Sequence, residues 1–183
     1  GRGGMGAVYR ARREGAEFEQ EVALKVSKPG SLPRDELLAR FRHEQRILAS
    51  LDTLGVSRIV DSGVSEAGQP YIVMEFIQGL PLQDYCEHHK LSVKSRLQQL
   101  IRLCRIIAHC HRRRVIHGDI KSNNVLIDGD GEVRLLDFGI AELLDPGKVD
   151  DKSRPNAMTL SVASPEQIQG QAVTTESDVY QLG

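Results

Sequence analysis

The sequence predicts an α+β fold in two parts, a small β-rich part over residues 1–77 and a mainly helical part over residues 78–183. Before position 78 the chain contains four runs rich in β-branched and aliphatic residues, and polar turns separate them. After Gly79 apolar residues recur at helical spacing along residues 91–115. A β-hairpin signal follows that stretch, so the second part also contains two strands.

The strand-like runs of the first part form two pairs, over residues 7–13, 21–28, 58–64 and 70–77. A polar turn around Gly15 joins the first pair, and the turn signal Glu66-Ala67-Gly68 separates the second pair. Between the pairs, residues 33–51 have the spacing of an amphipathic helix. Its apolar stripe consists of Leu37, Phe41, Leu48 and Leu51.

The position that completes this stripe is Glu44. A carboxylate on the buried face of a helix needs a cationic partner or must be neutralised. Lys25, on the predicted strand 21–28, would serve as that partner. In the alternative interpretation, Glu44 lies at the edge of the stripe and is solvated.

In the second part, residues 91–115 predict a long helix with Ser92 as its N-cap. Arg112 to Arg114 suit the negative end of the helix dipole. The expected buried face consists of Val93, Leu97, Leu100, Ile101, Cys104, Ile107 and Ala108. The runs 124–127 and 132–138 flank Asp-Gly-Asp-Gly, which predicts a hairpin, and the polar residues 142–158 predict a loop.

Composition narrows the class of protein. The formal net charge is -1 and 27% of residues are charged, which does not indicate a nucleic-acid partner, and no apolar run is long enough to span a membrane. Cys86, Cys104 and Cys110 are odd in number and lack C-x-x-C spacing, so we expect reduced thiols in an intracellular protein. Cys104 and Cys110 are expected to fill the helix core, and a zinc site with a nearby histidine is the alternative.

The chain opens with Gly1 to Val8, which fits the pattern G-x-G-x-x-G-x-V. Glycines allow a backbone to approach phosphates closely and to donate N–H groups to them. A dinucleotide-binding turn shares the glycine spacing but opens a helix, whereas a strand is predicted here. Because the chain starts inside this run and stops at Gly183 just after a helical start, we expect a fragment that is truncated at both ends.

Further polar residues follow in an order that suits phosphoryl transfer. Lys25 stands in Val-Ala-Leu-Lys, and Glu44 follows it by 19 residues. Asp119 and Asn124 are five residues apart, and Asp137 begins Asp-Phe-Gly 18 residues after Asp119. Ser164-Pro165-Glu166 closes the polar loop. A lysine can hold phosphates, carboxylate and amide oxygens can ligate Mg²⁺, and a further carboxylate can accept a hydroxyl proton.

With these motifs the chain resembles the bacterial eukaryotic-like (Hanks-type) serine/threonine protein kinases over essentially all of its 183 residues. The resemblance implies a bilobal protein-kinase-like fold, with an N-lobe over 1–77 that contains the glycine-rich loop and hinge. Residues 78–183 would be a partial C-lobe with the catalytic loop, the activation loop and the start of the central helix. It also implies ATP and Mg²⁺ as cofactors, and protein substrates with serine or threonine acceptors.

The resemblance also implies roles for individual residues. The implied catalytic set is Asp119, Lys121, Asn124, Lys25, Glu44 and Thr159. The implied nucleotide-binding set is Gly1, Gly3, Gly4, Gly6, Val8, Ala23, Lys25, Met74, Glu75, Ile77, Leu126 and Asp137, whose apolar members are equally well explained as core. Asn124 and Asp137 would ligate the metal. Asp178 resembles the buried aspartate that steadies the catalytic loop, and His117 is expected to hold that loop rather than to transfer a proton.

Gly118 stands where most members of this family have arginine. That arginine normally needs a phosphate or acid from the activation loop, so we expect activity that does not depend on phosphorylation of Ser153, Thr159 or Ser161. His-Gly-Asp also resembles small-molecule phosphotransferases that act on aminoglycosides or choline. Lys121, Thr159 and Ser-Pro-Glu-Gln favour a protein substrate over that alternative.

Four departures from the family pattern are Ser122 for proline, Met158 for glycine, Leu160 for proline and Val162 for an aromatic residue. The last three lie where a substrate peptide would dock, so they concern substrate preference more than catalysis. A nucleotide-binding pseudokinase scaffold is a further alternative, which the presence of all the polar site residues opposes. The resemblance implies a cytoplasmic kinase domain, with any membrane tether in regions outside this chain.

Overall fold

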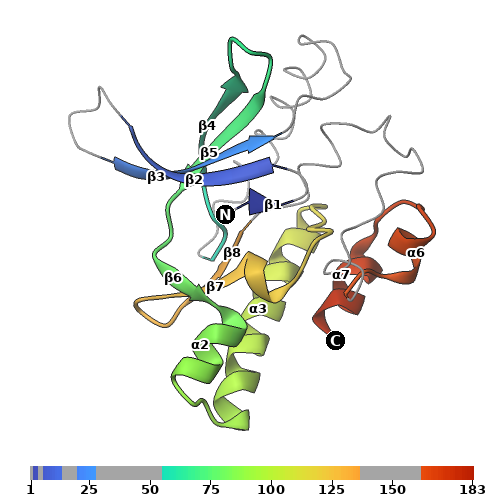
Figure 1. Ribbon diagram of the computed structural model, residues 1–183. Coiled ribbons are helices and arrows are strands. Elements are labelled where there is room, and N and C mark those ends of the chain that lie inside the picture. Colours follow the sequence, from blue (N-terminus) through green and yellow to red (C-terminus); the bar gives the residue numbers. More distant parts are fainter. Residues whose placement is uncertain (1, 4–5, 14–19, 28–54, 137–161) are drawn as a thin grey trace. The chain divides into compact units, whose positions relative to one another are not determined.

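The computed structural model describes residues 2–3, 6–13, 20–27, 55–136 and 162–183 (Figure 1). Predictions that fall on other residues, including the helix over 33–51, lie outside the described residues. The described residues form two compact units, and the chain passes from the first to the second between Ile77 and Gln78. Gly55 and Val56 belong to the second unit.

The first unit is an antiparallel sheet with the strand order β1-β2-β3-β5-β4 (Figure 1). The strands are β1 (Arg2–Gly3), β2 (Gly6–Arg13), β3 (Gln20–Ser27), β4 (Ile59–Val64) and β5 (Pro70–Glu75). The two predicted strand pairs are confirmed, although β5 ends two residues earlier than expected. The pairs join through β3 and β5, so that β3 lies in the interior of the sheet.

The register of this sheet sets which residues share a face. Lys25 of β3 lies opposite Val8 of β2 and Ile72 of β5, and Ala23 lies opposite Met74. Directly opposed residues in an antiparallel sheet project to the same side, and so do residues two apart on one strand. One face therefore carries all five of these residues.

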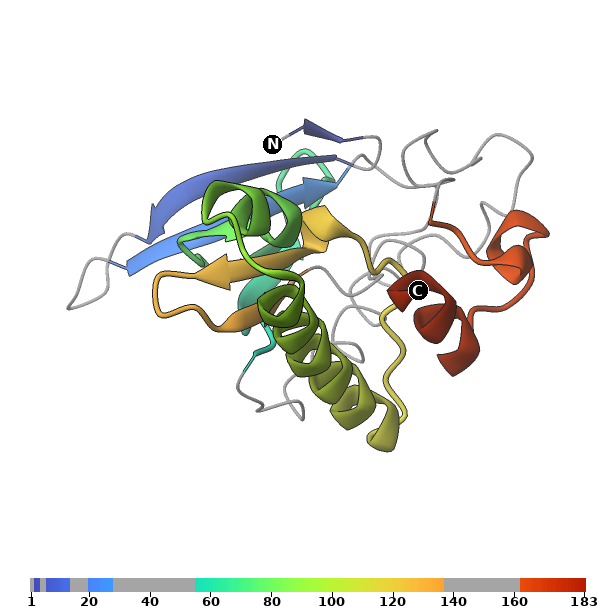
Figure 2. The same cartoon turned by 90° about the horizontal axis from the view of Figure 1, so that it is seen from below.

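The second unit combines a small sheet with helices. The strands are β6 (Gly79–Pro81), β7 (Val125–Asp128) and β8 (Val133–Leu135), which pair in that order. The helices are α2 (Leu82–His88), α3 (Val93–Arg112), a 3₁₀ turn (Ser122–Asn124), α6 (Pro165–Ile168) and α7 (Thr175–Leu182). The predicted hairpin is confirmed as β7–β8, and it packs beside α3 (Figure 1 and Figure 2).

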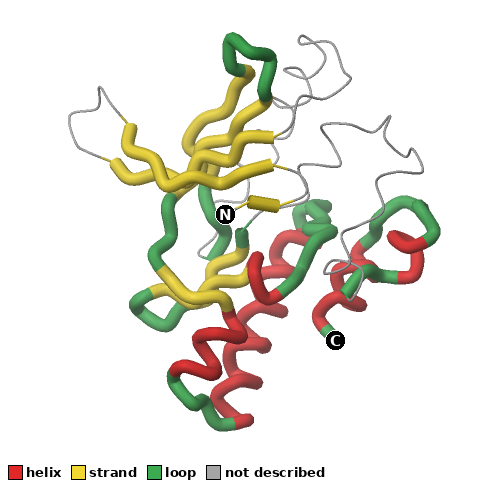
Figure 3. Tube along the Cα trace, viewed as in Figure 1, coloured by secondary structure: helices red, strands yellow, loops and turns green. Residues whose placement is uncertain are grey.

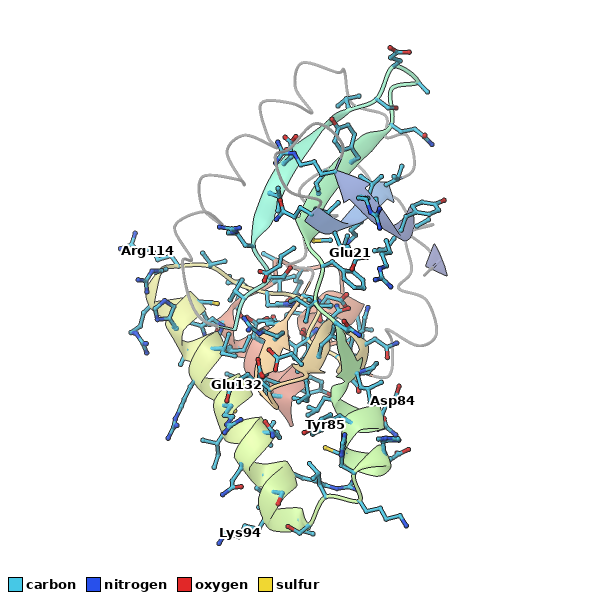
Figure 4. All side chains as sticks on the ribbon, turned by 90° about the vertical axis from the view of Figure 1, so that its left-hand side faces the viewer. Glu21, Asp84, Tyr85, Lys94, Arg114 and Glu132 are labelled. Atoms are coloured by element: carbon cyan, nitrogen blue, oxygen red, sulfur yellow. The ribbon has the colours of Figure 1, made fainter. Side chains whose placement is uncertain are left out.

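Helix α3 begins as predicted, because the Ser92 hydroxyl accepts the N–H of Ser95 at 3.2 Å and so caps the helix. It ends at Arg112, and Arg114 follows with a φ of 60°. A left-handed residue of this kind turns the chain away from the helix axis. Figure 4 shows Lys94 near one end of α3 and Arg114 just beyond the other.

The predicted buried face of α3 is confirmed at Ile107 but is wrong at five other positions, which are exposed: Val93, Leu97, Ile101, Cys104 and Ala108. The structure buries Leu103, Ile106, Ile107 and Cys110, whereas Val93 is 75% exposed and Leu97 is 52% exposed. Helix α3 has apolar residues on more than one stripe, and the β7–β8 hairpin and Gly55 cover a different stripe from the one expected. A Cβ atom at Gly55 would lie 2.5 Å from the Cδ1 atom of Ile106, so Ile106 would have to shift to make room for it, and the φ of 106° at Gly55 also favours glycine.

The change of buried face on α3 also changes which cysteines are buried. Cys86 and Cys110 are buried, but Cys104 is exposed, so the predicted helix-core role is right for Cys110 and wrong for Cys104. All three are free thiols. Burial, followed by the charge of Asp178, raises the pKa of Cys110 to about 11, so this thiol stays protonated at neutral pH.

Within the described residues no three histidine, cysteine, aspartate or glutamate side chains gather closely enough to hold a metal ion. None of the helices in the described part of the chain combines the length and the apolar character that crossing a membrane requires.

Candidate active site

The chain between α3 and β7 is mostly loop (Figure 3), and it includes Asp119. The two oxygens of the Asp119 carboxylate have different surroundings. Oδ2 accepts hydrogen bonds from Lys121 Nζ at 2.7 Å and from Asn124 Nδ2 at 2.9 Å. Oδ1 is shielded from solvent and accepts no hydrogen bond from any described residue. A buried carboxylate oxygen without a donor is costly, which makes it a strong acceptor for a hydroxyl group that enters the site.

Asn124 is hydrogen-bonded to Asp119 and Lys121 of the same loop. Its Nδ2 donates to the backbone oxygen of Asp119 at 2.8 Å as well as to the carboxylate, and its N–H donates to the Lys121 carbonyl. The side-chain amide is therefore oriented, because its nitrogen faces two acceptors. The amide oxygen makes neither of these bonds and is the atom of this residue that can ligate a cation.

His117 is 1% exposed and has a structural role, as expected. Its Nδ1 accepts the N–H of Asp119 at 3.2 Å, and its Nε2 lies 2.8 Å from the backbone oxygen of Leu136. These partners require the tautomer with the proton on Nε2, since one nitrogen meets a donor and the other meets an acceptor. The ring therefore joins the loop that carries Asp119 to Leu136, the residue after β8.

Leu136 is the last described residue before Asp137, and both of its backbone groups are bound. Its N–H donates to the Asn124 carbonyl at 2.8 Å, and its carbonyl accepts from His117. Leu136, the residue before Asp137, is thus hydrogen-bonded to the loop that carries Asp119 and Asn124.

Asp178 is the anchor of the loop within α7, and its side chain is 0% exposed. Its Oδ1 accepts the N–H of Gly118 at 2.7 Å, and its Oδ2 accepts the N–H of His117 at 2.9 Å. His111 Nε2 of α3 lies 2.7 Å from the same Oδ2. The buried carboxylate therefore has three hydrogen-bonding partners, which offset the cost of removing it from water.

Gly118 has a φ of 76°, the left-handed region that a glycine adopts without a steric penalty. A Cβ atom there would lie 3.5 Å from Val173 Cγ1, an ordinary contact. The backbone conformation, rather than lack of space, thus accounts for glycine between His117 and Asp119. Gln167 and Gln181 also bind the Gly118 backbone oxygen.

His111, Gln167 and Gln181 are site residues that the sequence analysis missed. Gln181 is 63 positions from Gly118, and His111 is 67 positions from Asp178. No local pattern links residues so far apart, so folding alone brings them together.

The Ser-Pro-Glu segment is joined to α7 by Glu166, whose carboxylate accepts a hydrogen bond from the Ser177 hydroxyl. This bond, together with a backbone hydrogen bond, lowers the pKa of Glu166 below its usual value. Ser164, the residue before Pro165, is the N-cap of α6, and its backbone N–H donates to Gln167 Oε1 at 3.0 Å as part of a capping box.

In the first unit, the sheet brings together four of the residues that were predicted to bind nucleotide. Val8, Ala23, Lys25 and Met74 lie on one face, as the strand register requires. The N–H of Glu75 donates to the Arg58 carbonyl at 2.9 Å, and the Glu75 carbonyl takes no part in this hydrogen bond.

The remaining predicted residues divide into three groups. Gly3 and Gly6 lie in β1 and β2, where they pair with each other, and Ile77 is the last residue of the first unit. Leu126 lies in β7 of the second unit. Outside the described residues lie Gly1, Gly4, Glu44, Asp137 and Thr159.

Known proteins resemble this chain along its whole length. The family profile described as "Protein kinase domain" matches residues 1–183. The chain is 37% identical to serine/threonine-protein kinase PrkC of Bacillus subtilis and covers 28% of that protein. It is 34% identical to serine/threonine-protein kinase PknB of Mycobacterium tuberculosis and covers 30% of it. All of this chain is matched in both cases, so it spans less than a third of these curated relatives.

Among solved structures, the PknI kinase domain of M. tuberculosis superposes with a TM-score of 0.70 at 26% sequence identity. That match covers 100% of this chain and 66% of the PknI chain. The likeness therefore includes residues of both units.

Proposed function

The chain belongs to the protein kinase domain family and has its bilobal fold, and from this premise we propose that it forms the catalytic centre of a serine/threonine protein kinase. Such an enzyme transfers the γ-phosphoryl group of ATP to a serine or threonine hydroxyl of a protein. The observation that carries the proposal is the Asp119 carboxylate, with one oxygen bound by Lys121 and Asn124 and the other buried without a described partner.

Asp119 would orient the acceptor hydroxyl and accept its proton on Oδ1. The hydroxyl oxygen would bond to the γ-phosphorus while the bond to the leaving ADP breaks. Lys121, at 2.7 Å from Oδ2, would place a positive charge next to the transferred group. General-base catalysis of this kind contributes about 10²- to 10⁴-fold in rate.

Asn124 and Asp137 are the residues that would hold Mg²⁺, which supplies charge neutralisation at the phosphates when bound. The Asn124 side chain fits this role, because hydrogen bonds from its nitrogen to Asp119 orient the amide. Asp137 would contribute a carboxylate from the residue after Leu136, whose backbone is bound to the same loop.

The first unit would bind the nucleotide. Its shared sheet face, with Val8, Ala23, Lys25 and Met74, supports this assignment, since apolar residues suit a purine and a lysine suits phosphates. Glu44 would pair with Lys25, and the Glu75 carbonyl and Ile77 N–H would bind adenine. Thr159 would bridge Asp119 and Lys121.

We further propose that activity does not depend on phosphorylation of the activation loop. Two observations support this. Glycine at position 118 has no side chain, so there is no positive charge that a phosphate would have to neutralise. The backbone of Gly118 is already bound by Gln167 of α6 and by Asp178 and Gln181 of α7. Complete dephosphorylation, and a Ser153→Ala/Ser161→Ala variant, should each retain activity within about threefold of the untreated protein. A loss of tenfold or more after phosphatase treatment would contradict this part of the proposal.

The main test incubates the full-length protein with γ-labelled ATP, Mg²⁺, a generic protein substrate, and a panel of aminoglycosides and choline. Phosphoamino-acid analysis then identifies the acceptor. The variants are Asp119→Asn and Asp137→Ala, and the matched control is Asp130→Asn, an exposed aspartate in the β7–β8 turn.

Label on serine or threonine that falls at least about 100-fold in Asp119→Asn and persists in Asp130→Asn would support the proposal. Label on a small molecule alone would identify a small-molecule phosphotransferase instead. ATP binding without transfer to any acceptor would identify a pseudokinase scaffold.

A further inference from the structure

Two glutamines from different helices meet at the backbone of the catalytic loop. Gln167 of α6 donates from Nε2 to the Gly118 carbonyl at 2.7 Å. Gln181 of α7 donates from Nε2 to the same carbonyl at 3.3 Å and to Gln167 Oε1 at 2.8 Å. The Oε1 atom of Gln181 accepts the N–H of Ile120 at 2.7 Å.

The partners fix the orientation of both side-chain amides. Gln167 Oε1 accepts from the Ser164 N–H, the Ser164 hydroxyl and Gln181 Nε2, so three donors converge on this oxygen. Rotating either amide by 180° would bring donors against donors and acceptors against acceptors. Both glutamines are half-buried, which makes such a rearrangement expensive.

The position of these contacts along the chain is informative. The Gly118 carbonyl belongs to the peptide group before Asp119, and the Ile120 N–H belongs to the peptide group after it. Each peptide group is planar, so the two planes on either side of a residue define its φ and ψ. A side chain that binds both planes therefore holds the direction of the Asp119 Cα–Cβ bond, while Lys121 and Asn124 bind the carboxylate at its end.

We propose that Gln181 is a positioning residue for the catalytic Asp119, and that Gln167 holds Gln181 in place. Gln181 binds the peptide groups on both sides of Asp119. Asp178, one turn earlier on α7, accepts the N–H groups of His117 and Gly118. Helix α7 thus supports the loop at four backbone positions. This inference rests on the proposed function, since it assumes that Asp119 is the base.

Two substitutions of Gln181 test the inference in the full-length protein. Gln181→Met keeps the length of the side chain and removes both hydrogen-bonding atoms. Gln98→Met, at an exposed glutamine of α3, is the matched control. We expect Gln181→Met to lower kcat about tenfold to 100-fold with KM for ATP changed less than about threefold, because small displacements of a reacting group are costly in rate.

Gln181→Glu provides a readout that a general loss of stability would not produce. The introduced carboxyl would still accept the Ile120 N–H, but in its ionised form it would face the Gly118 carbonyl and Gln167 Oε1. When protonated, it would donate to one of those oxygens as the native amide does. The ratio of its kcat to that of the wild type should therefore rise as the pH falls, whereas the ratio for Gln181→Met should stay constant.

Hydrogen–deuterium exchange separates this inference from the proposed function. In Gln181→Met the Ile120 amide should exchange at least about tenfold faster than in the wild type and in Gln98→Met, whether or not the protein is active. A wild-type protein without kinase activity would refute the proposed function, and the exchange rates would still decide whether Gln181 holds the loop. Wild-type kcat or unchanged Ile120 exchange in Gln181→Met would overturn the inference.

Discussion

Asp178→Asn replaces a buried anchor with a side chain of the same shape, so its effect can be worked out from the hydrogen bonds. The carboxylate accepts from Gly118 N–H on one oxygen and from His117 N–H and His111 on the other. Asparagine has one acceptor oxygen and one amino group. In either orientation the amino group faces a backbone N–H, so at least one buried donor loses its acceptor.

The magnitude follows from the contacts that change. A hydrogen bond to a charged group contributes about 1.5–3 kcal/mol, and leaving a buried N–H unsatisfied costs about 1–3 kcal/mol. Because these two estimates describe overlapping parts of one change, we expect a loss of about 2–4 kcal/mol in the free energy of unfolding. That is a large fraction of the 5–15 kcal/mol of a typical domain.

Urea unfolding followed by far-ultraviolet circular dichroism measures this loss, and hydrogen exchange at His117 and Gly118 locates it. Asp130→Asn is the control, since it makes the same carboxylate-to-amide change at an exposed position in the β7–β8 turn. The control should change stability by less than about 0.5 kcal/mol. If Asp178→Asn were as stable as Asp130→Asn, the assignment of Asp178 as the anchor of the loop would be refuted.

Four further predictions concern backbone conformation, the accessibility of thiols and titration. Gly118→Ala should destabilise the protein by about 1–2 kcal/mol in urea unfolding, because φ is 76° there, and an unchanged midpoint would contradict the left-handed assignment. Iodoacetamide near neutral pH should label Cys104 in the folded protein and Cys110 only after denaturation, as mass spectrometry of tryptic peptides would show. The raised pKa of Cys110 also means that its contribution to stability is present below its ordinary pKa of 9.0 and is lost as the pH rises towards 11. Because the pKa of Glu166 is lowered by the Ser177 hydroxyl, Ser177→Ala should cost stability at neutral pH, and this cost should shrink as the pH falls through the folded-state pKa of Glu166. Urea midpoints that differ by the same amount at every pH would argue against that coupling.

Local sequence patterns were sufficient for β2 to β5, for α3, for the β7–β8 hairpin and for the order of the site residues, but they did not predict β6, α2 or α6. Alternating and β-branched runs predicted β2 to β5, and Asp-Gly-Asp-Gly predicted the β7–β8 hairpin, because such signals act over a few residues. Ser92 identified the start of α3 for the same reason. Asp119, Lys121 and Asn124 are close in sequence, so their mutual hydrogen bonds are within reach of a short loop.

Tertiary structure decided what depends on distant partners. Helix α3 has apolar residues on more than one stripe, and periodicity does not say which stripe the hairpin and Gly55 will cover, so Cys104 was misplaced. The links from Gln181 to Gly118 and Ile120 cross more than 60 residues and rely on side chains without a local pattern. The sequence alone thus determined which chemical groups this protein carries. The packing of α7 against the loop determined how the backbone on both sides of Asp119 is held, because only folding brings Gln181 within hydrogen-bonding distance of Gly118 and Ile120.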